Sequence, residues 1–167
     1  ATAITRAYND WLFHFCNKDA ARLKFVALLA PQDPVAAAEE LGRAVKERGA
    51  LAGVLPTYLP QMPDFGDGFY DPIYTAAEQL GVGIGFHTGT SADSLGGQRF
   101  RKFLSAHTID HPAEQMIALI ATIVGGVFEQ WSDIVNNKWP GVVVKHTENL
   151  IANYCKNKSN NDENKID

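Results

Sequence analysis

The stretch Val82-Gly83-Ile84-Gly85-Phe86-His87-Thr88-Gly89-Thr90 decides the fold, because an uncharged apolar run leads directly into a histidine and small polar residues. Such a run, placed after a helical pattern that stops at Gly81, is typical of a parallel β-strand covered on both faces. His87 would then stand at the carboxyl end of the strand. Ligands and catalytic groups gather at that end in parallel α/β proteins, since helices cover the faces of the sheet. His87 is therefore the first candidate functional residue.

The sequence before this stretch predicts two more strand-and-helix units. Strands are expected over residues 23–30 and 51–55. After the first strand, Asp33-Pro34 supplies a helix cap followed by a first-turn proline, and the helix that begins there is predicted to end at Gly49. Its apolar face comprises Val35, Ala38, Leu41 and Val45. Asp71-Pro72 repeats the cap-and-proline pattern before a short helix. Strands that begin near residues 23, 51 and 82 have the spacing of βαβ units, so we predict an α/β fold with a parallel sheet.

Two further helices carry apolar surfaces that need partners. The chain opens with apolar residues at a spacing of three and four: Ile4, Tyr8, Trp11, Leu12 and Phe15. After a loop, a helix is expected to begin within 99–105. His111-Pro112 is then predicted to open a long helix that is apolar around most of its circumference, and we expect this helix to be buried or packed in an interface. Gly125-Gly126 inside this helix indicates a bend or a close backbone approach.

Composition limits the class of protein. With 167 residues, 46% of them hydrophobic, one domain is expected over 1–150, followed by a disordered polar tail over 151–167. A net charge of -4, with no Lys/Arg cluster before the tail, argues against nucleic acid and membrane as partners and favours a small-molecule substrate. Cys16 and Cys155 form no disulfide or zinc pattern, and no leader or membrane-spanning run is present, so we expect a soluble cytoplasmic protein.

Other candidate site residues have structural explanations that we weigh beside the functional ones. His107 and His111 have helical spacing, but Pro112 is expected to place His111 at a helix boundary, which argues against a metal motif. His146 and Glu148 face one side of a predicted strand over 142–144 and its continuation, where a solvated edge is the simpler interpretation. Four aromatic residues after the second strand either line a pocket or anchor a loop to the core: Tyr58, Phe65, Phe69 and Tyr70.

Several motifs resemble a known family, the amidohydrolase-related metal-dependent hydrolases, in the branch that includes aminocarboxymuconate semialdehyde decarboxylase and non-oxidative aromatic acid decarboxylases. The resemblance covers about residues 7 to 135 and rests on Tyr8-Asn9-Asp10-Trp11-Leu12, Arg22 to Leu29, Asp33 to Leu41, Tyr70-Asp71-Pro72-Ile73-Tyr74, Gly85-Phe86-His87, His111 to Met116 and Gly125 to Glu129. It implies a (β/α)8 barrel with a divalent metal, often zinc, at the carboxyl ends of the strands.

Only part of the family's metal site has a counterpart in this chain. The family uses a His-x-His pair on the first barrel strand, a histidine on a middle strand and an aspartate on the last; only the middle histidine is matched, by His87. No His-x-His occurs, and one imidazole does not hold zinc, which needs about three protein ligands in a catalytic site. The resemblance therefore implies an incomplete barrel that lacks the first and last strands, with an incomplete metal site. In one of two alignments beyond Asn136, Glu148 takes the place of the family's acid or histidine.

Three functional interpretations remain open at this stage. The first is a metal-dependent hydrolase or non-oxidative decarboxylase that acts on a small carboxylic acid or amide-like substrate, with a divalent metal, zinc by expectation, at His87. The second is a noncatalytic barrel fragment that associates with itself, because an open barrel exposes strand edges and apolar faces. A homo-oligomer is expected. The third is a small α/β binding domain unrelated to the barrel enzymes.

Overall fold

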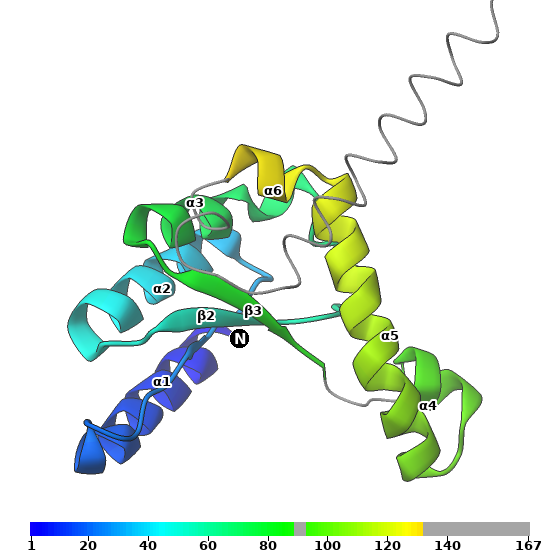
Figure 1. Ribbon diagram of the computed structural model, residues 1–167, viewed down its shortest axis with the longest axis horizontal. Coiled ribbons are helices and arrows are strands. Elements are labelled where there is room, and N and C mark those ends of the chain that lie inside the picture. The colour runs from blue at the N-terminus through cyan, green and yellow to red at the C-terminus, as the bar shows by residue number, and fades with distance from the viewer. Residues whose placement is uncertain (89–92, 132–167) are drawn as a thin grey trace, which may run out of the picture.

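The computed structural model describes residues 1–88 and 93–131, which form three parallel strands and their helices (Figure 1). The elements are α1 (Thr2–Cys16), η1 (Asn17–Asp19), β1 (Ala27–Leu28), α2 (Pro34–Arg48), β2 (Ala52–Pro56), η2 (Gly68–Tyr70), α3 (Asp71–Leu80), β3 (Gly83–His87), α4 (Leu95–Arg99), α5 (Phe103–Val124) and α6 (Val127–Gln130). The strand order β1-β2-β3 with parallel pairing confirms the predicted βαβ arrangement. The predicted strand over 142–144, His146, Glu148 and the tail over 151–167 lie outside the described residues.

The central strand β2 pairs with both of its neighbours in register. Leu55 lies opposite Phe86 and Pro56 opposite His87, so β2 and β3 end at the same level. β3 is half buried along most of its length, less than the buried strand that the sequence predicts, and among the described strands it pairs on one side only. β1 is shorter than the predicted 23–30, although backbone bonds from Leu51 to Phe25 and from Leu29 to Val54 continue the contact with β2 beyond it.

Helix α2 begins and ends where its sequence predicts. The Asp33 carboxylate accepts a hydrogen bond from the Ala36 backbone N–H at 3.1 Å, Pro34 is the first residue, and Gly49 ends the helix in the left-handed conformation with φ of 72°. The predicted buried face is partly wrong. Val35 is exposed, whereas Leu41 is fully buried with Ala37 and Ala44, because α2 meets the sheet and α3 through its small residues.

Helix α3 confirms the stop at Gly81, whose φ is 63°, but not the cap. Asp71 is the first residue of the helix, and Tyr70 occupies the cap position without a side-chain hydrogen bond. The turn before it is closed instead by Asp67, whose carboxylate accepts from the Phe69 N–H at 2.8 Å. The core lies between α2, α3 and the sheet, and its largest fully buried apolar side chains are Tyr70, Leu41, Leu55 and Ile73.

Helix α5 differs most from its prediction. It begins at Phe103, within the stretch 99–105 where a helix was expected to begin, and it runs through Pro112, so His111-Pro112 does not open a separate helix. The short α4 ends before it, at Arg99. Contacts with α4 and β3 on either side of Pro112, described below, hold the helix together although the proline donates no backbone hydrogen bond. Gly125 and Gly126 end the helix rather than lie inside it. The predicted close approach is confirmed, since a β-carbon on Gly125 would collide with the backbone of Gly66.

The opening helix α1 packs with its polar side toward the sheet. Thr5, Asn9 and Cys16 are buried, whereas most of the predicted apolar stripe, namely Ile4, Tyr8, Trp11 and Phe15, is exposed, with the three aromatic rings in contact along the helix. The stripe is therefore a surface without cover from the part of the chain described here. Within residues 1–88 and 93–131, no helix combines the length and apolar character needed to cross a membrane.

Candidate functional site

The carboxyl ends of β2 and β3 place His87 where the sequence predicts it. Its side chain is exposed at the end of β3, while the next residue, Thr88, is buried. The hydroxyls of Thr88 and Thr57 lie 2.9 Å apart and join the segments that follow the two strands. The imidazole is thus presented from a fixed backbone, which is the arrangement that a ligand or substrate contact at the strand ends requires.

Helix α5 brings two more histidines to His87. The Gln115 side chain donates a hydrogen bond to the Phe86 carbonyl at 2.9 Å, next to His87 in the chain. His111, one helical turn before Gln115, has its ring centroid 6.1 Å from that of His87, with the two rings perpendicular. His107 lies one turn further, 4.2 Å from His111 by the same measure. The expectation that Pro112 separates this pair is wrong, because the helix continues through it.

Two buried carboxylates attach the segment that follows β3 to α5. Asp110 is fully buried and accepts hydrogen bonds from the Ser94 hydroxyl at 2.8 Å and from the Gly96 N–H at 2.5 Å. Glu114 accepts from the Leu95 N–H at 3.3 Å. These bonds satisfy donors at the start of α4 and fix it against α5. Sequence reasoning missed both residues, although a signal existed: they are the only Asp, Glu, Lys or Arg residues between Lys102 and Glu129, inside an otherwise uncharged helix.

The described residues do not complete a metal site. In residues 1–88 and 93–131, no three His, Cys, Asp or Glu side chains converge on a point that could hold an ion. His87 and His111 are suitable donors, but a catalytic zinc site takes about three protein ligands. His87 as a metal ligand stays a prediction; the His111 imidazole lies beside it, and we derive no chemical step through a metal.

The aromatic residues after β2 anchor their loop. Phe65 and Tyr70 are buried, with ring centroids 4.7 Å apart, and the Tyr70 hydroxyl donates to the Pro63 carbonyl at 2.9 Å. Burial raises the pKa of Tyr70 to about 12, with Asp67 and Asp64 adding to the effect. Tyr58 and Phe69 are largely exposed. Of the two interpretations, the structure thus favours anchoring for Phe65 and Tyr70.

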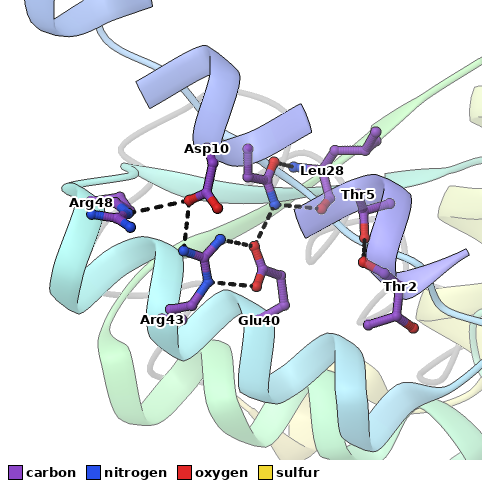
Figure 2. Close-up of polar contacts among 8 residues, drawn as sticks. Thr2, Thr5, Asp10, Leu28, Glu40, Arg43 and Arg48 are labelled. Carbon is purple, nitrogen blue, oxygen red and sulfur yellow. Dashed lines mark hydrogen bonds and ion pairs between the residues drawn. The ribbon is translucent and has the colours of Figure 1, made fainter. Parts of the chain in front are cut away.

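A second polar cluster joins α1, β1 and α2 (Figure 2). Arg43 binds both carboxylate oxygens of Glu40 at 2.8 Å and reaches Asp10 at 2.7 Å. Asn9, fully buried, donates to Glu40 and to the Leu28 carbonyl and accepts from the Leu28 N–H, at 2.8–3.0 Å. Every buried side-chain nitrogen or oxygen that the structure describes has a partner. We therefore assign this cluster to stability and not to a binding site.

The cluster shifts the pKa values of its charged groups. The hydrogen bond from Arg43 lowers the pKa of Asp10, with the positive charges of Arg43 and Arg48 contributing. Burial by itself would raise the pKa of Glu40, but hydrogen bonds from Arg43 and Asn9 outweigh it, so the pKa lies below its ordinary value. The Arg43 pKa is raised, chiefly by its hydrogen bond to Glu40. All three groups are therefore charged at neutral pH.

Parallel strands with helices in alternation and a histidine at the strand ends define the α/β class of protein. Comparison with known proteins gives the same class and its family. The amidohydrolase family model (Amidohydro_2) matches residues 1–148, and the chain belongs to that family. This confirms the resemblance seen in the sequence.

Solved structures of similar fold include aromatic acid decarboxylases. The 5-carboxyvanillate decarboxylase of Sphingomonas paucimobilis matches with a TM-score of 0.70 and 22% identity, over 79% of this chain and 39% of that one. The 2,6-dihydroxybenzoate decarboxylase of Rhizobium matches with 0.67 and 24%, over 79% and 43%. A 5-carboxyvanillate decarboxylase of Novosphingobium aromaticivorans, solved with manganese and a nitrobenzoic acid, matches with 0.66 and 24%, over 78% and 37%. The chain thus spans less than half the length of these proteins, as an incomplete barrel does.

Proposed function

We propose that the chain contributes part of the active site of a metal-dependent hydrolase or non-oxidative decarboxylase that acts on a small carboxylic acid or amide-like substrate. The observation that carries this proposal is the exposed His87 imidazole at the carboxyl end of β3, in a chain of the amidohydrolase family. Aromatic acids are the substrate class that the decarboxylase names among the similar structures support. The remaining ligands would come from outside the described residues.

His87 would bind a divalent metal through one ring nitrogen. Zinc is our expectation, and manganese is supported by the decarboxylase structure solved with that ion. Such an ion supplies a Lewis acid that polarises a carboxylate or carbonyl oxygen. The chain's own contribution is orientation: Gln115 binds the Phe86 carbonyl next to His87 in the chain, and the His111 ring lies perpendicular to that of His87. The free, buried thiol of Cys16 is consistent with a reducing cytoplasm as the compartment we propose.

A metal analysis tests the proposal. The purified chain would be incubated with zinc or manganese, passed through a desalting column and analysed for bound metal, beside His87→Ala and the control His14→Ala, which removes an exposed histidine of α1. Because the remaining ligands lie outside the described residues, the test rests on the difference between variants: metal that the parent and His14→Ala retain should be lost in His87→Ala. His87→Ala that retains as much metal as the parent would overturn the assignment of His87, and a metal-free parent would favour the second candidate function given below.

The stability of the metal-free protein gives an independent test. Because the His87 side chain is exposed, His87→Ala is expected to lower the free energy of unfolding by less than about 1 kcal/mol, well below the cost of removing a buried hydrogen-bonding group. Urea titrations of the metal-free parent and variant measure the difference. A larger loss would show that the imidazole has a structural role.

A noncatalytic fragment that associates with itself is the second candidate function. It is favoured by the lack of three converging ligands among residues 1–88 and 93–131. It predicts a metal-free parent protein in the first experiment, together with an oligomer in solution.

A further inference from the structure

Two histidines of helix α5 lie one turn apart on the same face of the helix. His107 and His111 are separated by four positions, and their ring centroids are 4.2 Å apart with the rings at 70° to each other. The sequence argued against a metal motif at this pair because Pro112 was expected to mark a helix boundary. The helix continues through Pro112, from Phe103 to Val124, so this objection to a metal site no longer holds.

The spacing of the pair is that of a helical zinc motif. In the His-Glu-x-x-His motif of metalloproteases, two histidines four residues apart bind the ion from one helix face, and the glutamate acts as a general base. This chain reads His107-Thr108-Ile109-Asp110-His111, so it keeps both imidazoles, while Thr108 stands in the place of the glutamate. The pattern thus indicates metal binding without the base that hydrolysis needs.

The two rings are close to the separation that a shared ion requires. With zinc–nitrogen bonds of about 2.1 Å, two imidazoles on one tetrahedral ion have centroids about 5 Å apart. The observed 4.2 Å is within reach of a small rotation of either ring. Phe103 stacks on His107, with centroids 5.1 Å apart. A neutral imidazole binds an ion through one nitrogen and donates a hydrogen bond through the other, so further contacts of His107 are compatible with ligation.

The helix between the two histidines is held in place by Asp110. This residue is fully buried, and its two carboxylate oxygens accept hydrogen bonds from the Ser94 hydroxyl and the Gly96 N–H. A β-carbon on Gly96 would collide with the Ala106 carbonyl, so α4 packs directly against this turn of α5. Because both oxygens of Asp110 are engaged, the imidazoles are the ligands of the pair, and the nearby negative charge favours a cation beside them.

We propose that His107 and His111 form a divalent-metal site on α5, separate from the one expected at His87, that takes an ion such as zinc through two imidazole nitrogens. Imidazole is a suitable ligand for zinc, copper and nickel. Water completes the coordination, since no three His, Cys, Asp or Glu side chains converge among residues 1–88 and 93–131. A site with two protein ligands holds zinc less firmly than one with three, so this ion is expected to be lost on a desalting column.

Titration with zinc at equilibrium tests the pair. Zinc chloride is added to the purified, metal-free chain in a calorimeter, beside His107→Ala and His111→Ala and two control variants, His87→Ala and His14→Ala. We expect a zinc-binding event that both controls retain, and a dissociation constant at least about tenfold higher when either histidine of α5 is removed. Unchanged circular dichroism spectra would show that all the variants are folded.

A spacing variant separates the geometry of the pair from the number of histidines on α5. His107→Ala combined with Ile109→His keeps two histidines on the helix but places them two residues apart, about 200° around its axis. Ile109 is 43% exposed, so the new imidazole can be accommodated. We expect this double variant to bind zinc as weakly as His107→Ala alone.

Four results would overturn the proposal: a parent chain that binds no zinc, binding that His107→Ala retains in full, binding that is lost in His87→Ala, and a double variant that regains the affinity of the parent. Loss in His87→Ala would assign the ion to the strand ends instead. A failure of the desalting experiment would count against the proposed function and leave the result of this titration unaffected, so the two proposals fail separately.

Discussion

The two outer strands of the sheet are both held by the side-chain amide of a helical residue, but the surroundings of the two amides differ. At β1, Asn9 of α1 binds the N–H and carbonyl of Leu28 and is itself held by Glu40 within the buried charge cluster. At β3, Gln115 of α5 makes one hydrogen bond, to the Phe86 carbonyl, beside an exposed histidine. The difference teaches that the β1 side of the molecule is held by a buried network of hydrogen bonds and charges, whereas the β3 side leaves His87 exposed.

The largest expected effect is that of Asn9→Ala. The substitution removes three hydrogen bonds at a fully buried position and should lower the free energy of unfolding by about 3 kcal/mol. Urea denaturation of parent and variant measures this. A loss below 1 kcal/mol would mean that the β1 side is no more firmly held than the β3 side.

The second largest expected effect is a loss of stability at low pH, through the charge cluster on the β1 side. Glu40 has a folded-state pKa below its ordinary value of 4.5, so its stabilising contribution is complete above that pH and is lost as the pH falls through the lower folded-state value. The unfolding free energy of the parent should therefore decline below about pH 4.5. In Arg43→Gln, which removes the main partner of Glu40, stability should be lower at pH 7 and should fall less between pH 5 and pH 3. Denaturation midpoints measured across this range would contradict the assignment if the two profiles were parallel.

Gln115→Ala should have the smallest effect on stability, about 1 kcal/mol, because one half-buried hydrogen bond is lost. Its main consequence is expected at the histidines. Without this bond α5 is free to shift along β3, so the NMR signals of His87 and His111 should move, whereas those of His14 on α1 should not. Unchanged signals at His87 would show that Gln115 does not position it.

Local signals in the sequence predicted the fold well where backbone chemistry dominates. Asp33-Pro34, Gly49 and Gly81 act within one or two turns, so the bounds of α2 and the end of α3 were predictable. Contacts between distant residues were not. The continuation of α5 through Pro112 depends on Ser94, Gly96 and Phe86, none of which a helical pattern includes. The buried role of Asn9 was hidden for the same reason, since its partners lie on β1 and α2.

The candidate site was predictable to a similar extent. The position of His87 followed from an apolar run and its carboxyl end, which the parallel register of β2 and β3 confirms. Its role as a metal ligand stays a prediction. The proximity of His111 and His107 was missed because a proline after a histidine ordinarily marks a helix boundary, whereas here the proline lies inside the helix.

Gly66 and Gly125 are far apart in the sequence but lie in direct backbone contact. The loop after β2 touches the end of α5 backbone to backbone, and a methyl group on either glycine would overlap main-chain atoms of the other segment. The helix cannot relieve such an overlap except by moving outward. A side chain added at either glycine would therefore displace α5 together with its histidines, His107 and His111, so a substitution far from these histidines can move them.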